Sequence, residues 1–131
     1  MRRVVADIFF EWNEPLEGFT TWPYLDTHRK ADGTLDPIVT TGVGNALFTV
    51  QEFVSLPWKR TDGSLASFAE AVAAWDTVRA RVDLALKGGG AFAPLTKIRL
   101  DRADVEILVR RRLFEMAADL RRRFVHFDEW P

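Results

Sequence analysis

Apolar residues recur at a helical spacing in three parts of the chain. The first part covers residues 3–13, and Pro15 is expected to end it because the residue before a proline avoids the helical conformation. The second begins at Phe68 and continues to Leu86, and the third extends from Asp101 to Phe124. Their apolar positions are Val4, Val5, Ile8, Phe9 and Trp12; Phe68, Val72, Trp75, Val78, Val82 and Leu86; and Val105, Leu108, Val109, Leu113, Met116, Ala117, Leu120 and Phe124. We expect three helices that bury these faces.

Polar residues mark the starts of two helices, the one at Phe68 and a further one that begins near Thr49. Glu52 follows Thr49 by three residues, and Glu70 follows Ser67 by three, which is the spacing of a helix-capping box. The sequence "KGGG" at 87–90 is expected to stop the second long helix, because glycine commonly ends helices.

Residues 18–46 carry turn chemistry instead of a helical pattern. The turn residues are Gly18, Pro23, Asp32, Gly33, Asp36, Pro37, Gly42 and Gly44. Between them, the β-branched stretch "TLDPIVTTGV" at 34–43 predicts a small hairpin or an irregular sheet. The predicted order is a helix, a β-rich segment and then further helices. This order predicts a mainly helical α+β domain with a small β-hairpin region after the first helix.

Length and composition limit the classes of function. The 131 residues suffice for one domain with a single core, and the net charge of −1 gives no overall attraction to nucleic acid. Without cysteine there is no disulfide framework, and the two distant histidines suggest no metal site. Asp7 and Glu11 interrupt the apolar start, so we expect no signal peptide and no membrane insertion. The protein would then be cytoplasmic until released or delivered elsewhere.

Two carboxylates flank the segment "EGFTTWPYLD". Glu17 and Asp26 lie nine positions apart, and glycoside hydrolysis commonly needs one protonated and one ionised carboxyl group. The aromatic residues Phe19 and Trp22 could keep Glu17 protonated by disfavouring its charged form, whereas Asp26 lies in a polar stretch. Solvated surface acids are the alternative interpretation. Glu11 and Glu14 are the other candidates for the acid, but no glycine follows them.

The sequence "TTGVGN" at 40–45 predicts a tight turn. Gly42 and Gly44 would supply positive φ angles for a hairpin, or would let a substrate or a catalytic threonine approach the backbone closely. The residues alone leave both interpretations open.

Together, these segments resemble the active-site region of the phage-type (T-even phage) lysozymes and related phage and prophage peptidoglycan hydrolases. The likeness consists of Glu17-Gly18, an aromatic two residues before Asp26, and the glycine-rich turn, in which Asn45 replaces the usual histidine. It implies that Glu17 is the general acid and that Asp26 and Thr40 hold the attacking water. It also implies that Tyr24 supports the cleft wall, and Thr41 could replace Thr40. The substrate-binding residues would be Tyr24, Thr41, Gly42, Gly44, Asn45 and Trp58.

The resemblance implies a single lysozyme-like domain, residues 1–131, that hydrolyses the bond between N-acetylmuramic acid and N-acetylglucosamine with inversion and without metal or cofactor. The stretches "LTKIRLDRADVEILV" and "FDEWP" look like matching parts of the related hydrolases, in which a further helical region follows. We therefore expect a domain incomplete at its C-terminus, with Leu120, Phe124 and Trp130 exposed or covered by a second copy. The alternative is an inactive lysozyme-fold remnant that binds cell-wall glycan or a protein partner.

Aromatic and basic residues allow further interpretations. Trp22 and Trp58 could line a glycan cleft or pack in the core, whereas Trp12 and Trp75 lie on apolar helix faces. Residues 99–123 contain eight arginines and five acids. Pairs such as Glu106 with Arg110 and Asp119 with Arg123 favour a solvated helix face, and attraction to an anionic polymer is the alternative. We expect glycan strands, and no nucleic acid, as the partner.

Overall fold

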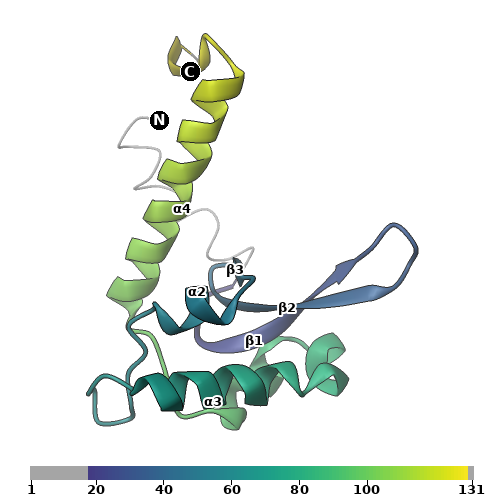
Figure 1. The fold of residues 1–131 in the computed structure, drawn as a ribbon, viewed down its shortest axis with the longest axis vertical. Helices are drawn as coiled ribbons and strands as arrows, with labels where there is room; N and C mark the ends of the chain where they lie inside the picture. The colour runs from purple at the N-terminus through teal and green to yellow at the C-terminus, as the bar shows by residue number, and fades with distance from the viewer. Residues whose placement is uncertain (1–17, 130–131) are drawn as a thin grey trace.

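The protein is a small mixed α/β domain with a three-stranded antiparallel sheet (Figure 1). The computed structural model describes residues 18–129, so the expected helix at 3–13 lies outside the described residues. The elements in chain order are β1 (Thr20–Arg29), β2 (Leu35–Gly42), β3 (Asn45–Leu47), α2 (Val50–Val54), α3 (Phe68–Arg79), the 3₁₀ helices η1 (Val82–Lys87) and η2 (Gly89–Leu95), α4 (Arg102–Arg123) and the 3₁₀ helix η3 (Phe127–Glu129).

The sheet is a meander in the order β1-β2-β3. Its register pairs Tyr24 with Thr40 between β1 and β2, and Thr41 with Asn45 between β2 and β3. The hairpin expected from "TLDPIVTTGV" is confirmed, but the ten-residue strand β1 was not predicted. Pro23 lies within this strand and argued against it, and a register shift between Thr20 and Tyr24 occurs at the proline.

The core forms between one side of the sheet and helices α2 and α3. Leu25, Val39 and Leu47 share the same cross-strand row, and all are nearly inaccessible to solvent. Phe53 of α2 stacks on Trp58 with ring centroids 4.7 Å apart and meets the edge of Trp75 of α3 at 5.4 Å. The expectation that Trp75 belongs to the core is therefore confirmed.

Helix α3 begins as predicted but ends early. Ser67 and Glu70 form the full capping box, with Glu70 N donating to Ser67 Oγ at 3.1 Å. The α-helix stops at Arg79, and Val82 and Leu86 are exposed, so the predicted continuation to Leu86 is wrong. The backbone leaves the helical region at Arg81 and returns toward β1 through η1 and η2. This path places Ala85 and Phe92 in the core, which a straight helix would not do.

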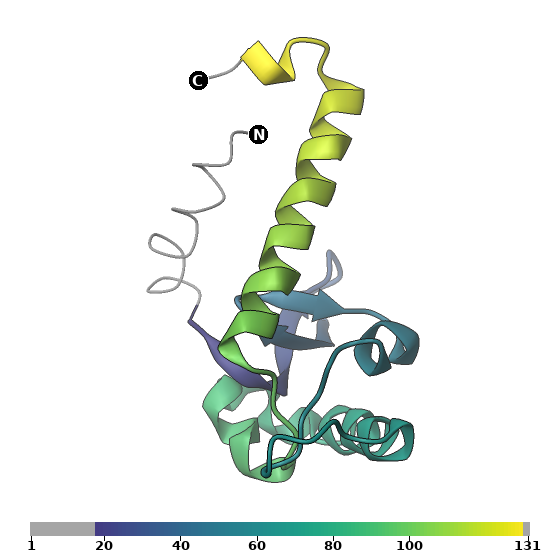
Figure 2. The same cartoon turned by 90° about the vertical axis from the view of Figure 1, so that its left-hand side faces the viewer.

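Helix α4 confirms the predicted third helix. Val105, Leu108, Val109 and Ala117 are its buried residues, and Asp119 pairs with Arg123 at 2.8 Å as expected. Figure 2 shows its C-terminal part extending away from the sheet and α3. On the predicted apolar face, Met116 and Phe124 are exposed and Leu120 is half-buried. Between residues 18 and 129, no helix has the length and apolar character needed to cross a bilayer.

Backbone hydrogen bonds join segments that are far apart in the sequence. Leu100 N donates to Thr21 O at 2.8 Å, and Lys59 and Arg99 exchange two hydrogen bonds at 2.8 and 2.9 Å. The segment 96–101 is thereby fixed both to β1 and to the turn that follows α2.

Candidate functional site

The β1–β2 ladder places two of the predicted catalytic residues on one face of the sheet. Asp26 pairs with Ile38, and Tyr24 pairs with Thr40, so Asp26 and Thr40 are diagonal neighbours in the register. The Asp26 side chain is exposed, and its Oδ1 accepts a hydrogen bond from Thr27 N at 2.9 Å. Its carboxylate is therefore available to a ligand in solvent.

The two threonines are buried. Thr40 is 2% exposed and donates from Oγ1 to Ile38 O at 3.0 Å, and Thr41 is fully buried and donates to Trp22 O at 3.1 Å. Because both hydroxyl protons are taken by backbone carbonyls, each hydroxyl offers only its oxygen lone pairs to any further partner. The sequence did not predict this burial.

The turn between β2 and β3 requires both glycines. Gly42 and Gly44 each have a φ angle of 66°, a backbone conformation that residues with a Cβ atom rarely adopt. At Gly42 a Cβ would lie 2.9 Å from Asn45 Oδ1 and 3.0 Å from Val105 Cγ1. Asn45 Oδ1 accepts from Val43 N at 3.2 Å, so the asparagine stabilises the turn from within. The hairpin interpretation of the glycines is confirmed, and a role in substrate approach stays a prediction.

Tyr24 lies between the sheet and the glycine-rich segment. A Cβ at Gly89 would be 3.3 Å from the Tyr24 ring, so the ring packs closely on the backbone of η2. The neighbouring Trp22 is half-buried and donates from Nε1 to Gly89 O at 2.9 Å. The "KGGG" segment thus serves as a packing surface for two aromatics of β1.

Trp58 requires a correction. It was predicted to bind substrate, but it is 2% exposed and stacked on Phe53, and its Nε1 donates to Phe53 O at 2.8 Å. A ring enclosed in this way cannot stack on a sugar. Trp58 is a core residue whose only polar group is satisfied by the protein.

Glu17, the predicted general acid, and its alternatives Glu11 and Glu14 lie outside the described residues, as do Trp12 and Trp130. Among residues 18–129, no group of three or more potential metal-binding side chains occurs.

A groove of about 380 Å³ adjoins the β2–β3 turn. One wall contains Gly44, Asn45 and Phe48, a residue that is 65% exposed. The other wall is the α4 face that includes Arg112 and Met116. Arg112 Nη2 donates to Ala46 O at 3.2 Å, which fixes the helix to β3 beside the groove. A mostly apolar groove with a few polar groups is typical of small-ligand sites. Phe48 and Arg112 were not predicted; the position of Phe48 just after the turn was the available signal.

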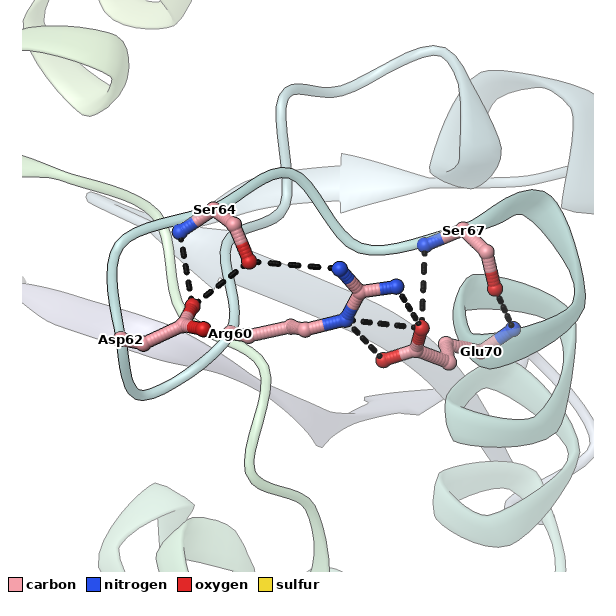
Figure 3. A network of polar contacts seen from close by, with 5 residues as sticks. All are labelled: Arg60, Asp62, Ser64, Ser67 and Glu70. Atoms are coloured by element: carbon pink, nitrogen blue, oxygen red, sulfur yellow. Dashed lines mark hydrogen bonds and ion pairs between the residues drawn. The ribbon is translucent and has the colours of Figure 1, made fainter.

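The titratable groups with displaced pKa values lie away from this groove. Hydrogen bonds from Arg60 and, to a smaller extent, from Ser67 lower the pKa of Glu70 to about 2, and those from Ser64 lower the pKa of Asp62 (Figure 3). Figure 3 shows that Arg60 links these residues into one surface network at the start of α3. Such lowered values reflect stabilised carboxylates and give no candidate for a protonated general acid.

Comparison with protein-family models, curated proteins and solved structures gives no match to this chain. The geometry and the sequence pattern are therefore the basis for any functional assignment.

Proposed function

We propose that the protein is a lysozyme-like hydrolase of peptidoglycan glycan strands, which cleaves between N-acetylmuramic acid and N-acetylglucosamine. The observation that carries the proposal is the β1–β2 register, in which the exposed Asp26 is the diagonal neighbour of Thr40 and lies beside the pair Tyr24–Thr40. The tight turn at 42–45 follows on the same strand. These features accompany the order Glu17, Asp26, Thr40 in the sequence.

Each residue has a defined task in this proposal. Glu17 protonates the leaving oxygen, and the Asp26 carboxylate orients the water that attacks the sugar from the opposite face. Because Thr40 is buried, holding the water falls mainly to Asp26, and a lone pair of Thr40 is secondary. Thr41 is the next residue of the strand and lies on the opposite face of the sheet. Tyr24 supports the cleft wall. Gly44 and Asn45 offer the groove beside α4 to a sugar ring, whose apolar face fits the walls formed by Phe48 and Met116.

A second candidate function is glycan binding without cleavage. The engagement of both threonine hydroxyls by backbone carbonyls favours it, because neither then has a free donor for a water molecule. The groove would serve this function equally well.

The test is digestion of purified peptidoglycan with the 131-residue chain. Soluble fragments are reduced with borohydride and analysed by mass spectrometry, which distinguishes a reduced N-acetylmuramic acid end from a reduced N-acetylglucosamine end. Parallel samples contain Glu17→Gln, Asp26→Asn and the control Asp76→Asn, which alters an exposed acid of α3.

The proposal is supported if the wild type and Asp76→Asn release fragments that end in reduced N-acetylmuramic acid, and Glu17→Gln and Asp26→Asn release none. Equal release by all four proteins would remove Glu17 and Asp26 from catalysis. Absence of release, together with sedimentation of the wild type with the insoluble glycan, would favour binding without cleavage.

A further inference from the structure

A second pocket, of about 530 Å³, lies between the turn at 59–63 and the segment 93–101. The residues that matter for its chemistry are Lys59, Arg60, Thr96, Lys97, Arg99 and Asp101. It shares no lining residue with the groove beside Asn45.

The walls of this pocket are held by backbone hydrogen bonds. Lys59 and Arg99 are paired as an isolated antiparallel bridge, and Lys59 also pairs with Leu65. The turn is closed by Arg60 N donating to Ser64 O at 2.7 Å and Gly63 N donating to Arg60 O at 2.9 Å. The pocket therefore has a formed backbone frame, which reduces the entropy cost of ordering it around a ligand.

The cations on the turn side of the pocket are neutralised. Lys59 is paired with Asp101 and with Asp104, the latter at 2.8 Å. Arg60 donates from Nε to both carboxylate oxygens of Glu70 at 2.9 and 3.0 Å (Figure 3). These two cations already have carboxylate partners from the protein, so they are not available to an anionic ligand. Three carboxylates, of Asp101, Asp104 and Glu70, face the two cations, so this cluster carries a net charge of −1.

Arg99, on the opposite side, has no carboxylate partner among residues 18–129. Its Nη1 donates to Thr96 O and Ile98 O at 2.7 and 2.8 Å, and its Nη2 donates to Ala93 O at 2.6 Å. A guanidinium has five N–H donors. Three are used, so the Nε–H and one Nη2–H remain. Among residues 18–129, the half-buried charge is balanced by carbonyl dipoles and the nearby face of Trp22.

Two neighbours of Arg99 add to this arrangement. The exposed Lys97 makes no hydrogen bond or ion pair through its side chain within the described part of the chain. Thr96 Oγ1 is buried, and it is the one buried side-chain polar atom among residues 18–129 without a hydrogen-bond partner. A guanidinium, an ammonium and a hydroxyl with unused hydrogen-bonding capacity thus come from four successive residues at one pocket.

We propose that this pocket binds an oxyanion, a carboxylate or phosphate group of a ligand, through Arg99, Lys97 and the Thr96 hydroxyl. The two free N–H groups of Arg99 suit two oxygens of such a group, and charged hydrogen bonds of this kind are stronger than neutral ones. Lys97 contributes charge, and rotation of the Thr96 side chain gives its hydroxyl an acceptor. This site is separate from the proposed glycan site and does not depend on glycan cleavage.

The test is a titration of the ¹⁵N-labelled full chain, followed by NMR, with sodium phosphate and separately with sodium acetate. Sodium chloride holds the ionic strength constant at pH 7. We expect saturable amide shifts centred on residues 59–63 and 96–99. The tighter of the two anions identifies the group that the pocket prefers, and either preference supports the site.

Matched variants separate specific binding from general charge. Lys97→Gln and Thr96→Val are each expected to weaken binding by about threefold to tenfold, the effect of one lost hydrogen bond or charge contact. Lys30→Gln removes an exposed lysine at the tip of the β1–β2 hairpin and should leave affinity unchanged. Arg99→Lys keeps the charge but loses the planar pair of donors, and it should weaken binding further.

Absence of saturable shifts with both anions would overturn the proposal, as would equal effects of Lys97→Gln and Lys30→Gln. If Arg99→Lys fails to fold, the anion affinity of the surface variant Lys97→Gln still tests the proposal.

Discussion

Trp22 and Gly89, which are 67 positions apart in the sequence, are joined by a 2.9 Å hydrogen bond from the indole Nε1 to the glycine carbonyl. The bond ties β1 to the start of η2, where the ring of Tyr24 also packs. The three-glycine segment, expected only to end a helix, therefore positions the strand that carries Asp26.

Replacing Trp22 with phenylalanine tests this connection. The Trp22→Phe variant loses the indole donor and leaves Gly89 O without that partner, so the free energy of unfolding should fall by about 1 to 2 kcal/mol. Urea denaturation followed by circular dichroism measures the change. A midpoint equal to that of the wild type would show that the bond contributes nothing to stability.

Gly42→Ala should destabilise the domain strongly. The variant combines a φ of 66° with contacts of 2.9 Å to Asn45 Oδ1 and 3.0 Å to Val105 Cγ1. The backbone conformation alone costs about 1 to 2 kcal/mol, and the contacts add to it. Gly33→Ala is the matched control, because Gly33 has a φ of 86° but open space around it. Thermal unfolding of both variants should show the larger loss for Gly42→Ala, and equal losses would exclude the close packing as a cause.

Thr96→Val should stabilise the protein. The substitution removes a buried hydroxyl that has no hydrogen-bond partner. Its removal should raise the free energy of unfolding by about 1 to 3 kcal/mol. Thr41→Val changes the same atoms at a buried hydroxyl that donates to Trp22 O, so it should destabilise by about 1 kcal/mol. Urea denaturation should therefore show a higher free energy of unfolding for Thr96→Val and a lower one for Thr41→Val. A loss of stability for Thr96→Val would show that its hydroxyl does not destabilise the folded protein.

The contact between Arg60 and Glu70 predicts a dependence of stability on pH. Hydrogen bonds from Arg60, the largest cause, and from Ser67 lower the pKa of Glu70 from 4.5 to about 2, so the folded state is favoured where the carboxylate is ionised. That contribution is fully present above the unfolded-state value and is lost as the pH falls from about 5 toward 2. Glu70→Gln should therefore reduce stability most at neutral pH, and its difference from the wild type should shrink in acid.

The Arg60→Gln variant is the control for this pH effect, since it removes the other partner. Its difference from the wild type should shrink over the same pH range. A difference between Glu70→Gln and the wild type that stays constant from pH 7 to pH 2 would exclude the ion pair as the source.

The proposed hydrolysis predicts inversion at the sugar carbon. If Asp26 orients a water on the face opposite the leaving group, the newly released reducing end should be the α-anomer. Proton NMR recorded immediately after glycan cleavage, before mutarotation, identifies the anomer. Asp26→Asn controls for other sources of reducing ends, and a β-anomer at first appearance would exclude the direct attack of water.

Local patterns predicted the start of α3, the extent of α4 and the turn at 42–45. The Ser67–Glu70 box and the apolar period of α4 depend on neighbours within one or two turns, so the sequence contains the information directly. Thr49 also caps α2, although the Glu52 carboxylate accepts from Phe48 N at 3.0 Å, one residue before the expected donor. The glycines at 42 and 44 were predicted from the same kind of local signal.

Features that depend on distant contacts were missed. Val82 and Leu86 continue the helical period of α3, but the chain turns away at Arg81 because Phe92 and Ala85 fill the core near β1. Trp58 was assigned to substrate because an exposed indole can stack on a sugar ring, whereas the structure buries it against Phe53. The oxyanion pocket depends on the bridge between Lys59 and Arg99, which no local pattern reveals.

The hydrogen bonds from β1 to Gly89 and Leu100 also bear on how the protein folds during its synthesis. The strands of the sheet can pair once Leu47 has left the ribosome, but a nascent chain ending at Gly88 still lacks the core residues Phe92, Ile98, Leu100 and Val105. Until these arrive, the part of the core that these four residues complete stays open to water and to chaperones. Among residues 18–129, Val109 is the last residue of the core cluster, so the core is complete only after most of this part of the chain has been translated.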